Sequence, residues 1–329
     1  MRPAHADRLD APLDVMTVDL STALGRLRLK NPIGTASGTF GYGLEFAEYL
    51  DLAALGAISV KGLSRRPCHG NPPPRICETD AGMLNAIGLQ NVGVDAFLEG
   101  KLPELARLGA TVIANVWGDA EDDYVAVVER IGSDRRIAAI EVNVSCPNVV
   151  KGGMIFGNNP EALSALVKRI RAATAHPLIV KLSPNVTDIV AVARAAVDAG
   201  ADALSLINTL VGLAIDLERR EPKIGFTTGG LSGPAIRPVA LRMVWEVRQA
   251  LPKVPIFGMG GIETVEHVVE YLVAGANAVQ IGTANFRDPS VAARLVTELT
   301  AWCADHGVAR VSDLVGTLRT RPRPDHLFS

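Results

Sequence analysis

Cysteine is scarce in this chain of 329 residues, with four copies, Cys68, Cys77, Cys146 and Cys303. They form no CxxC pair and no His/Cys cluster at zinc spacing, which argues against a structural metal site. So few cysteines in so long a chain also indicate a reducing compartment. We therefore expect no bound metal and a cytoplasmic location.

The chain also lacks an excess of positive charge and long apolar runs. The 33 Lys and Arg residues face 35 Asp and Glu, a net charge of −2 that argues against a nucleic-acid partner. The most apolar long segment, Ala203–Ile215, is shorter than the roughly 20 residues of a membrane-spanning helix. The first 15 residues lack the apolar core of a signal peptide. We expect no membrane partner, and a single domain over 16–318 with loosely ordered extensions at 1–15 and 319–329.

What the chain does have is a regular alternation of β-rich and amphipathic segments, with 48% hydrophobic residues. Eight strands are predicted at Pro32–Ala36, Ala57–Lys61, Thr111–Val116, Ala138–Val144, Leu178–Leu182, Ala203–Ile207, Val254–Met259 and Ala278–Gly282. Eight helices are predicted at Leu44–Leu55, Val94–Leu108, Ala120–Ile131, Pro160–Thr174, Val186–Ala199, Ala235–Leu251, Thr264–Ala274 and Pro289–His306. This pattern predicts a single-domain α/β fold, the (β/α)8 TIM barrel. No GxGxxG follows the first strand, which argues against a Rossmann domain.

Two connections are longer than an ordinary βα loop: Gly62–Gly93 after the second strand and Leu210–Pro234 after the sixth. Loops that follow the strands of a TIM barrel lie on its catalytic face. We expect these two to act as lids or substrate walls.

Polar residues end five consecutive predicted strands: Lys61, Asn115, Asn143, Lys181 and Asn208. In a barrel they would meet at one mouth. Burying two ammonium groups and three amides there costs several kcal/mol unless polar groups pair with them. The pattern favours a polar, anionic ligand over five unrelated solvated residues.

Small residues follow the last two strands, in GMGGI (Gly258–Ile262) and IGTANF (Ile281–Phe286). Loops at these two places in a TIM barrel frequently bind phosphate. The turn GGLSGPAIRP (Gly229–Pro238) would suit the back of a flat ring or a phosphate, or be a plain helix start. Together the motifs favour a phosphate-bearing cofactor or substrate.

Longer motifs cover most of the chain, from about Val18 to Arg287. They are NPIGTASGTFGYG, GNPPPRICETDAGMLNAIGLQN, IEVNVSCPNV, VKLSPNVTDI, INTL and GGLSGPAIRPVAL, with the two glycine motifs above. With them the chain resembles the FMN-containing dihydroorotate dehydrogenases, specifically the catalytic subunit of the NAD-linked class 1B. The class 1A enzymes, which use fumarate, usually read closer to NSMGLPN than to NAIGLQN. The segment GLSRRPCHGNPPP is more basic than its family counterpart.

The resemblance implies oxidation of (S)-dihydroorotate to orotate in pyrimidine biosynthesis. Cys146 would be the base that removes the C5 proton, and FMN would take the C6 hydride. Lys61 would touch both flavin and substrate, and Lys181 would lie beside the pyrimidine edge of the flavin. The implied substrate residues are Lys61, Asn85, Ala86, Ile87, Gly88, Leu89, Asn143, Asn208 and Thr209. The implied FMN residues are Ser37, Lys61, Gly62, Asn115, Asn143, Lys181, Ile207, Gly233, Gly260, Gly261, Gly282 and Thr283. Glu141 receives no role.

The class 1B resemblance also implies a partner subunit that carries FAD and a [2Fe–2S] cluster, in a heterotetramer of two catalytic and two electron-transfer subunits. Other readings stay open at this point. They are the fumarate-linked class 1A enzyme, a dihydropyrimidine or dihydrouridine oxidoreductase, an aldolase-like barrel with a Schiff-base lysine, and a binding-only barrel. A protein that purifies without a yellow colour would exclude the flavin enzymes.

Overall fold

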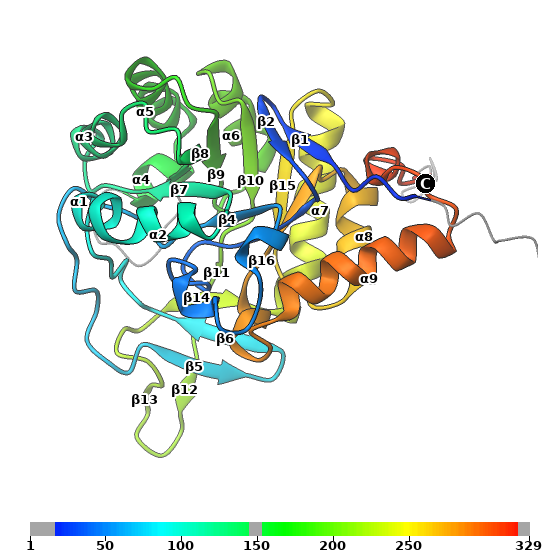
Figure 1. The fold of residues 1–329 in the computed structure, drawn as a ribbon. Helices are drawn as coiled ribbons and strands as arrows, with labels where there is room; N and C mark the ends of the chain where they lie inside the picture. Colours follow the sequence, from blue (N-terminus) through cyan, green and yellow to red (C-terminus); the bar gives the residue numbers. More distant parts are fainter. Residues whose placement is uncertain (1–16, 145–152, 322–329) are drawn as a thin grey trace, which may run out of the picture.

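Eight parallel strands close into a barrel in their order along the chain (Figure 1). The computed structural model describes residues 17–144 and 153–321. The barrel strands are β3 (Ile33–Thr35), β4 (Ala57–Ser59), β7 (Val112–Val116), β8 (Ile137–Asn143), β9 (Leu178–Lys181), β10 (Ala203–Leu206), β15 (Ile256–Met259) and β16 (Ala278–Ile281). Seven strands start within one residue of their predicted start, and β15 starts two residues after its predicted start at Val254. The predicted TIM barrel is confirmed, whereas the bounds of the two terminal extensions stay predictions.

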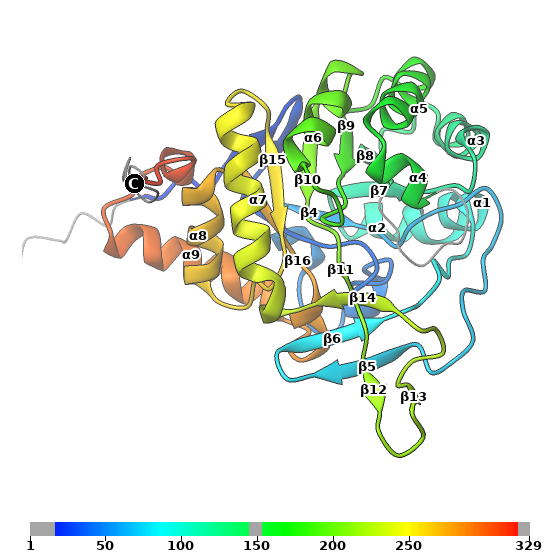
Figure 2. The same ribbon diagram turned by 180° about the vertical axis from the view of Figure 1, so that it is seen from behind.

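Helices surround the barrel, as Figures 1 and 2 show from opposite sides. They are α1 (Val94–Ala96), η3 (Phe97–Lys101), α2 (Leu102–Arg107), α3 (Glu121–Ile131), α4 (Gly153–Asn158), α5 (Pro160–Ala173), α6 (Ile189–Asp198), η4 (Pro234–Ile236), α7 (Arg237–Ala250), α8 (Val265–Ala274), η5 (Thr283–Phe286), α9 (Val291–Asp305) and η6 (Val311–Leu314). Local capping sets several of their starts: the Asn159 side chain accepts from two N–H groups of α5, and Asp188 does the same for α6. In the described ranges, no helix has the length and apolar character needed to cross a membrane.

The helix predicted over Leu44–Leu55 is wrong. Two short 3-10 helices, η1 (Leu44–Phe46) and η2 (Leu52–Ala54), lie there instead. The Asp51 side chain accepts from the N–H of Ala53 at 2.9 Å, which starts a new turn where a longer helix would have continued. Aspartate offers the backbone this alternative to helical hydrogen bonds, and it prevails here.

The barrel interior begins with an apolar layer. Ile113, Ile179 and Phe257 pack there with alanines from the neighbouring strands, and all are essentially buried. A hairpin of β1 (Thr22–Leu24) and β2 (Leu27–Leu29) closes this end of the barrel (Figure 1). The opposite end of the barrel, where each strand runs into the loop that follows it, is therefore the one available for a ligand.

Alternate residues of a strand share a face, so the next inward position lies two residues farther along. On six of the eight barrel strands that position is polar, whereas β15 has Met259 there. This polar layer consists of Ser59, Asn115, Glu141, Lys181, Ser205 and Gln280, all of them buried. A buried polar layer is costly unless its members pair with one another or with a ligand. Along its axis the barrel interior thus changes from the apolar layer to the polar layer, which lies just below the loops and is also called the polar floor.

The two long connections form a small antiparallel sheet over this end of the barrel, here called the cap sheet. It consists of β5 (Ile76–Thr79), β6 (Gly82–Asn85), β11 (Leu210–Gly212) and β14 (Gly229–Ser232), and a hairpin of β12 (Ile215–Asp216) and β13 (Glu221–Pro222) projects beyond it (Figure 1). In the central pairing Gly230 lies opposite Asn85. The two long connections, which were expected to act as lids or substrate walls, thus contain regular strands, whereas the sequence had suggested loops.

Candidate active site

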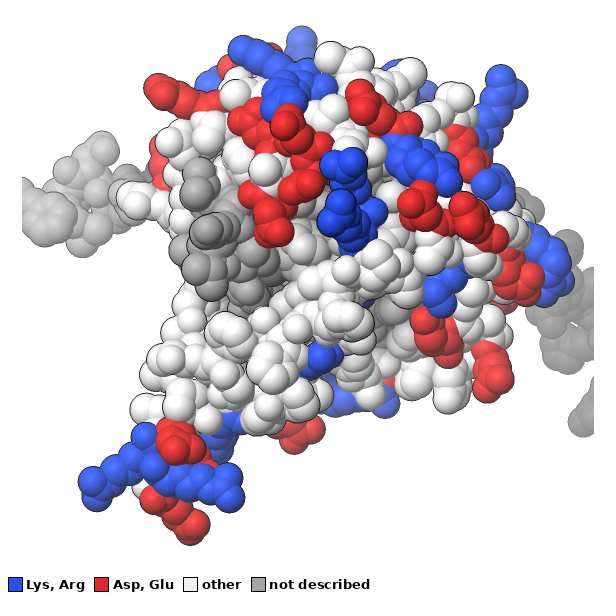
Figure 3. Space-filling view, turned by 90° about the vertical axis from the view of Figure 1, so that its left-hand side faces the viewer, with Lys and Arg blue, Asp and Glu red and all other residues white. Residues whose placement is uncertain are grey.

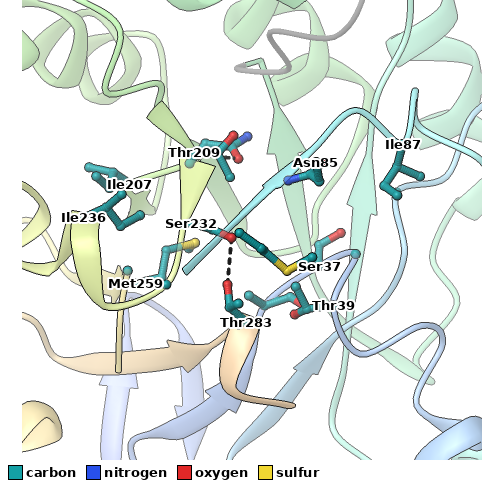
Figure 4. Close-up of a pocket in the computed structure, with 18 of the residues that line it drawn as sticks. Ser37, Thr39, Asn85, Ile87, Ile207, Thr209, Ser232, Ile236, Met259 and Thr283 are labelled. Carbon is teal, nitrogen blue, oxygen red and sulfur yellow. Dashed lines mark hydrogen bonds between the residues drawn. The ribbon is translucent and has the colours of Figure 1, made fainter. Parts of the chain in front are cut away.

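A cavity lies between the ends of the barrel strands and the cap sheet (Figure 4). The empty space inside it, open solvent included, amounts to about 1160 Å³. In the view of Figure 4, Asn85 and Thr209 lie across the cavity from Thr39 and Thr283. The cavity is therefore enclosed by residues of the barrel and of the long connections above it.

Most of the residues assigned from the sequence come together around this cavity. Those that line it are Ser37, Lys61, Gly62, Asn85, Ile87, Gly88, Leu89, Asn143, Lys181, Ile207, Asn208, Thr209, Gly233, Gly260, Gly261, Gly282 and Thr283. Two others are buried nearby without lining it, Ala86 in the loop after β6 and Asn115 in the polar layer. Cys146 lies outside the described residues. The individual roles of all these residues stay predictions.

Other residues line the cavity without having been assigned. They are Ala36, Gly38, Thr39, Ile76, Met83, Ser232, Ile236, Met259 and Phe286. Ser232 and Thr283 join the cap sheet to the barrel, because the Thr283 hydroxyl donates to Ser232 Oγ at 2.8 Å (Figure 4). Met259, the last residue of β15, could have been found from its strand-end position; Ile76 and Met83 could not, because no strand was predicted there.

An amide cluster lies at the ends of β8 and β10. The Asn208 amide donates to Asn143 Oδ1 at 3.4 Å, and the backbone N–H of Thr209 donates to Asn208 Oδ1 at 2.8 Å. The Tyr124 hydroxyl on α3 donates to the Asn143 carbonyl at 2.9 Å. These contacts fix two amides in the cavity wall, where they offer both donors and acceptors to a planar, polar ligand.

Two lysines bring positive charge to the cavity. Lys181 ends β9, is 4% exposed and stands opposite Asn143 in the β8–β9 register. Lys61 follows β4, and its backbone N–H donates to the Gly41 carbonyl at 2.8 Å. Ammonium groups on a largely buried surface favour a ligand that carries negative charge.

Three glycines bring backbone close to one corner of the cavity. Gly233, Gly260 and Gly261 have φ values of 95°, 133° and 68°, in the range that favours glycine. A side chain at Gly261 would come within 2.7 Å of the Gly233 carbonyl oxygen. Tyr271 holds the turn by donating to the Gly260 carbonyl at 2.7 Å, and burial raises the pKa of this phenol well above its usual value. The corner is tightly packed backbone, and its assignment to a phosphate stays a prediction.

With this fold and cavity in view, comparison with known proteins identifies the class. The family model for dihydroorotate dehydrogenase matches residues 19–302, and the chain belongs to this family. It is 56% identical over 300 residues to "Dihydroorotate dehydrogenase B (NAD(+)), catalytic subunit" of Geobacter sp. (strain M21), a match that covers 91% of this chain and 98% of that protein. Proteins of the same description from Geotalea uraniireducens (strain Rf4) and Geobacter sulfurreducens are 56% and 55% identical over 302 and 300 residues. Their matches cover 92% and 91% of this chain and 99% and 98% of the relatives. The resemblance drawn from the motifs is confirmed.

Proposed function

We propose that this chain is the catalytic subunit of an NAD-linked dihydroorotate dehydrogenase of the cytoplasm. It oxidises (S)-dihydroorotate to orotate with FMN as the immediate electron acceptor and passes the electrons to a separate subunit. The observation that carries the proposal is the cavity itself, where two lysines, an amide cluster and a glycine corner meet. The names of the relatives support the same activity and the NAD linkage.

The residues present fit FMN. The glycine corner after β15, together with Gly282 and Thr283 after β16, offers close backbone to a phosphate. At Gly282 a side chain would meet only ordinary contacts, the nearest at 3.7 Å from Ala36 Cβ, so that glycine leaves open space. In the polar floor, the buried Asn115 Oδ1 has no hydrogen-bond partner among the described residues and would gain one from a ring N–H.

The opposite wall suits dihydroorotate, a small ring with a carboxylate and two amide-like edges. Lys61 supplies a cation for the carboxylate. Asn143 and Asn208 supply donors and acceptors for the ring edges. Asn85 reaches the cavity from β6 and is tied to β14 by a hydrogen bond of 3.2 Å to the Gly230 carbonyl, so the cap sheet positions it.

The proposed reaction removes a proton from C5 and a hydride from C6 of the substrate. Cys146 follows β8 and serves as the base; an unperturbed thiol has a pKa of about 8.5, which suits proton removal near neutral pH. FMN, when bound, supplies the hydride acceptor. Lys181 contributes its positive charge on the cavity floor, where electrons and negative charge accumulate. The cap sheet excludes water from the reacting atoms.

The proposed partner carries FAD and a [2Fe–2S] cluster in a heterotetramer. Three cysteines of this chain, Cys68, Cys77 and Cys303, are free thiols. In the part of the chain that the structure describes, no three His, Cys, Asp or Glu side chains gather as metal ligands. The electrons therefore need groups supplied by another subunit to reach NAD.

We expect the purified chain to be yellow and to reduce a dye with dihydroorotate, but not to reduce NAD efficiently. NAD reduction should appear when the FAD and iron–sulfur subunit is added. Absorbance of the dye and of NADH, each measured with and without the partner, tests this. Efficient NAD reduction by the chain alone would contradict the proposed division of labour, and a colourless, inactive protein would contradict the flavin enzyme.

The proposed assembly needs a surface where chains meet, and the cap sheet and its hairpin expose large apolar side chains. These are Ile76, Val211, Leu213, Ile215, Leu217 and Phe226, from 38% to 83% exposed. On the face seen in Figure 3 the charges of both signs are interspersed over the upper part, and a largely uncharged area lies between them and a charged group at the lower left. Clustered exposed apolar side chains mark interaction surfaces.

We expect Leu217→Asp to weaken this assembly. Leu217 is 83% exposed and does not line the cavity, so the chain should keep its FMN. A charge buried in an apolar contact costs several kcal/mol, and the co-purified complex should lose mass in size-exclusion chromatography with light scattering. The matched control is Tyr49→Asp, at a residue 60% exposed between η1 and η2. An intact complex with Leu217→Asp would show that this surface is not an interface.

A further inference from the structure

Glu141 lies in the middle of the polar layer with its carboxylate fully buried. Its Oε2 accepts from the Asn115 amide at 2.6 Å, and its Oε1 accepts from the Gln280 amide at 3.0 Å. The Gln280 nitrogen also donates to Ser59 Oγ at 2.8 Å. Since β8 and β16 stand on opposite sides of the barrel, these bonds cross its interior.

The chemistry of a carboxylate decides which way both amides face. Both oxygens of the Glu141 side chain accept hydrogen bonds here, and an amide has a donating nitrogen at one end and an accepting oxygen at the other. Asn115 and Gln280 must therefore turn their nitrogens toward Glu141. The oxygen of each amide is left facing away from it.

For Asn115 this outward oxygen lies near Gly62, a residue of the cavity wall. Its Oδ1 is 3.1 Å from the place that a Cβ on Gly62 would occupy, and Gly62 lines the cavity. The same oxygen is buried and has no hydrogen-bond partner among the described residues. A buried acceptor next to a ligand cavity selects a ligand that brings a donor, because leaving it unpaired costs about 1–3 kcal/mol.

We propose that Glu141 is a positioning residue that holds Asn115 as a hydrogen-bond acceptor for an N–H group of the FMN ring. The inference rests on the proposed FMN site. Turned the other way, the Asn115 amide would set its own N–H groups against the ring N–H and lose the bond. Gln280 belongs to the same network. Like Asn115 it does not line the cavity, and its Oε1 is likewise buried without a hydrogen-bond partner among the described residues. Its removal leaves the contact between Glu141 and Asn115 in place.

The test compares FMN affinity of apoproteins, measured by the quenching of flavin fluorescence on titration. Glu141→Met keeps the chain length and removes both acceptors, so the dissociation constant should rise at least about tenfold. Glu141→Gln should stay within about threefold of the wild type. Its new amide oxygen accepts from Asn115, while Gln280 turns over and takes the new N–H and the Ser59 hydroxyl as donors.

The matched control is Gln280→Met, which breaks the other half of the network. It should lower the melting temperature about as much as Glu141→Met while FMN affinity stays within about threefold. Equal losses of FMN affinity in the two methionine variants would overturn the proposal, because the network would then be merely structural. An unchanged affinity in Glu141→Met would overturn it too. Failure of the wild-type apoprotein to bind FMN would instead reject the FMN site.

If Glu141→Met does not fold, a charge exchange gives the answer. Asn115→Asp alone places two carboxylates in contact, and FMN affinity should fall at least about tenfold. Adding Glu141→Gln restores a donor–acceptor pair and again leaves an oxygen facing the cavity. The double variant should therefore recover affinity to within about threefold of the wild type. No recovery would overturn the proposal.

Discussion

Cys146→Ala should lower the rate of dihydroorotate oxidation by about 10²–10⁴-fold, the usual contribution of a general base. Cys146 follows β8, and Asn143, the last residue of that strand, lines the cavity. Without the proposed base, removal of the C5 proton should become much slower. FMN should stay bound, because the substitution leaves the glycine corner and the polar floor unchanged. The dye-linked rate and the visible absorbance of the purified variant measure the two effects separately.

Two further variants sharpen this prediction. Cys146→Ser should retain some activity that grows at raised pH, because a hydroxyl gives up its proton far less readily than a thiol of pKa about 8.5. Cys77→Ala removes another thiol, on β5 of the cap sheet, and should leave the rate within about threefold of the wild type. Normal turnover by Cys146→Ala would show that a different group takes the proton.

Lys181→Met should lower kcat by about 10²–10³-fold, the usual loss on removing one group that stabilises developing charge. The side chain is 4% exposed and reaches the cavity from the end of β9, so its charge acts through little water. KM should change much less, because the lysine is assigned to the cofactor and not to the substrate. Steady-state kinetics with a dye acceptor separates kcat from KM.

The control for charge alone is Lys168→Met, at an exposed lysine on α5. It changes the net charge of the protein by the same amount and should leave kcat within about threefold of the wild type. If Lys181→Met also stays within that range, its ammonium is not part of the electrostatics of the reaction. A large rise in KM with unchanged kcat would place Lys181 on the substrate instead.

Much of the fold follows from patterns of short range. Eight apolar strands alternating with amphipathic helices predict a closed parallel barrel, because each helix must cover a strand that is buried on both faces. The strand ends were predictable for the same reason, and Lys61, Asn143, Lys181 and Asn208 do line one cavity. The glycine turn after β15 was also predictable from the sequence, since few other residues accept the backbone angles of Gly260 and Gly261.

Local competition explains the helix that was wrongly predicted. The residues of Leu44–Leu55 have helical periodicity, yet the cap made by Asp51 divides the segment into two short turns. Periodicity reports which face is apolar and says little about where a side chain competes with the backbone.

The sequence by itself therefore determined the barrel, its active end, the glycine turns and the family. Only the tertiary structure decided that two connections more than a hundred residues apart pair as the cap sheet, as Gly230 does with Asn85. It also decided that Glu141 meets Gln280 across the barrel at 3.0 Å. Both depend on hydrogen bonds between distant segments, and such partners leave no local periodicity in the chain. They become visible only when barrel closure brings the segments together.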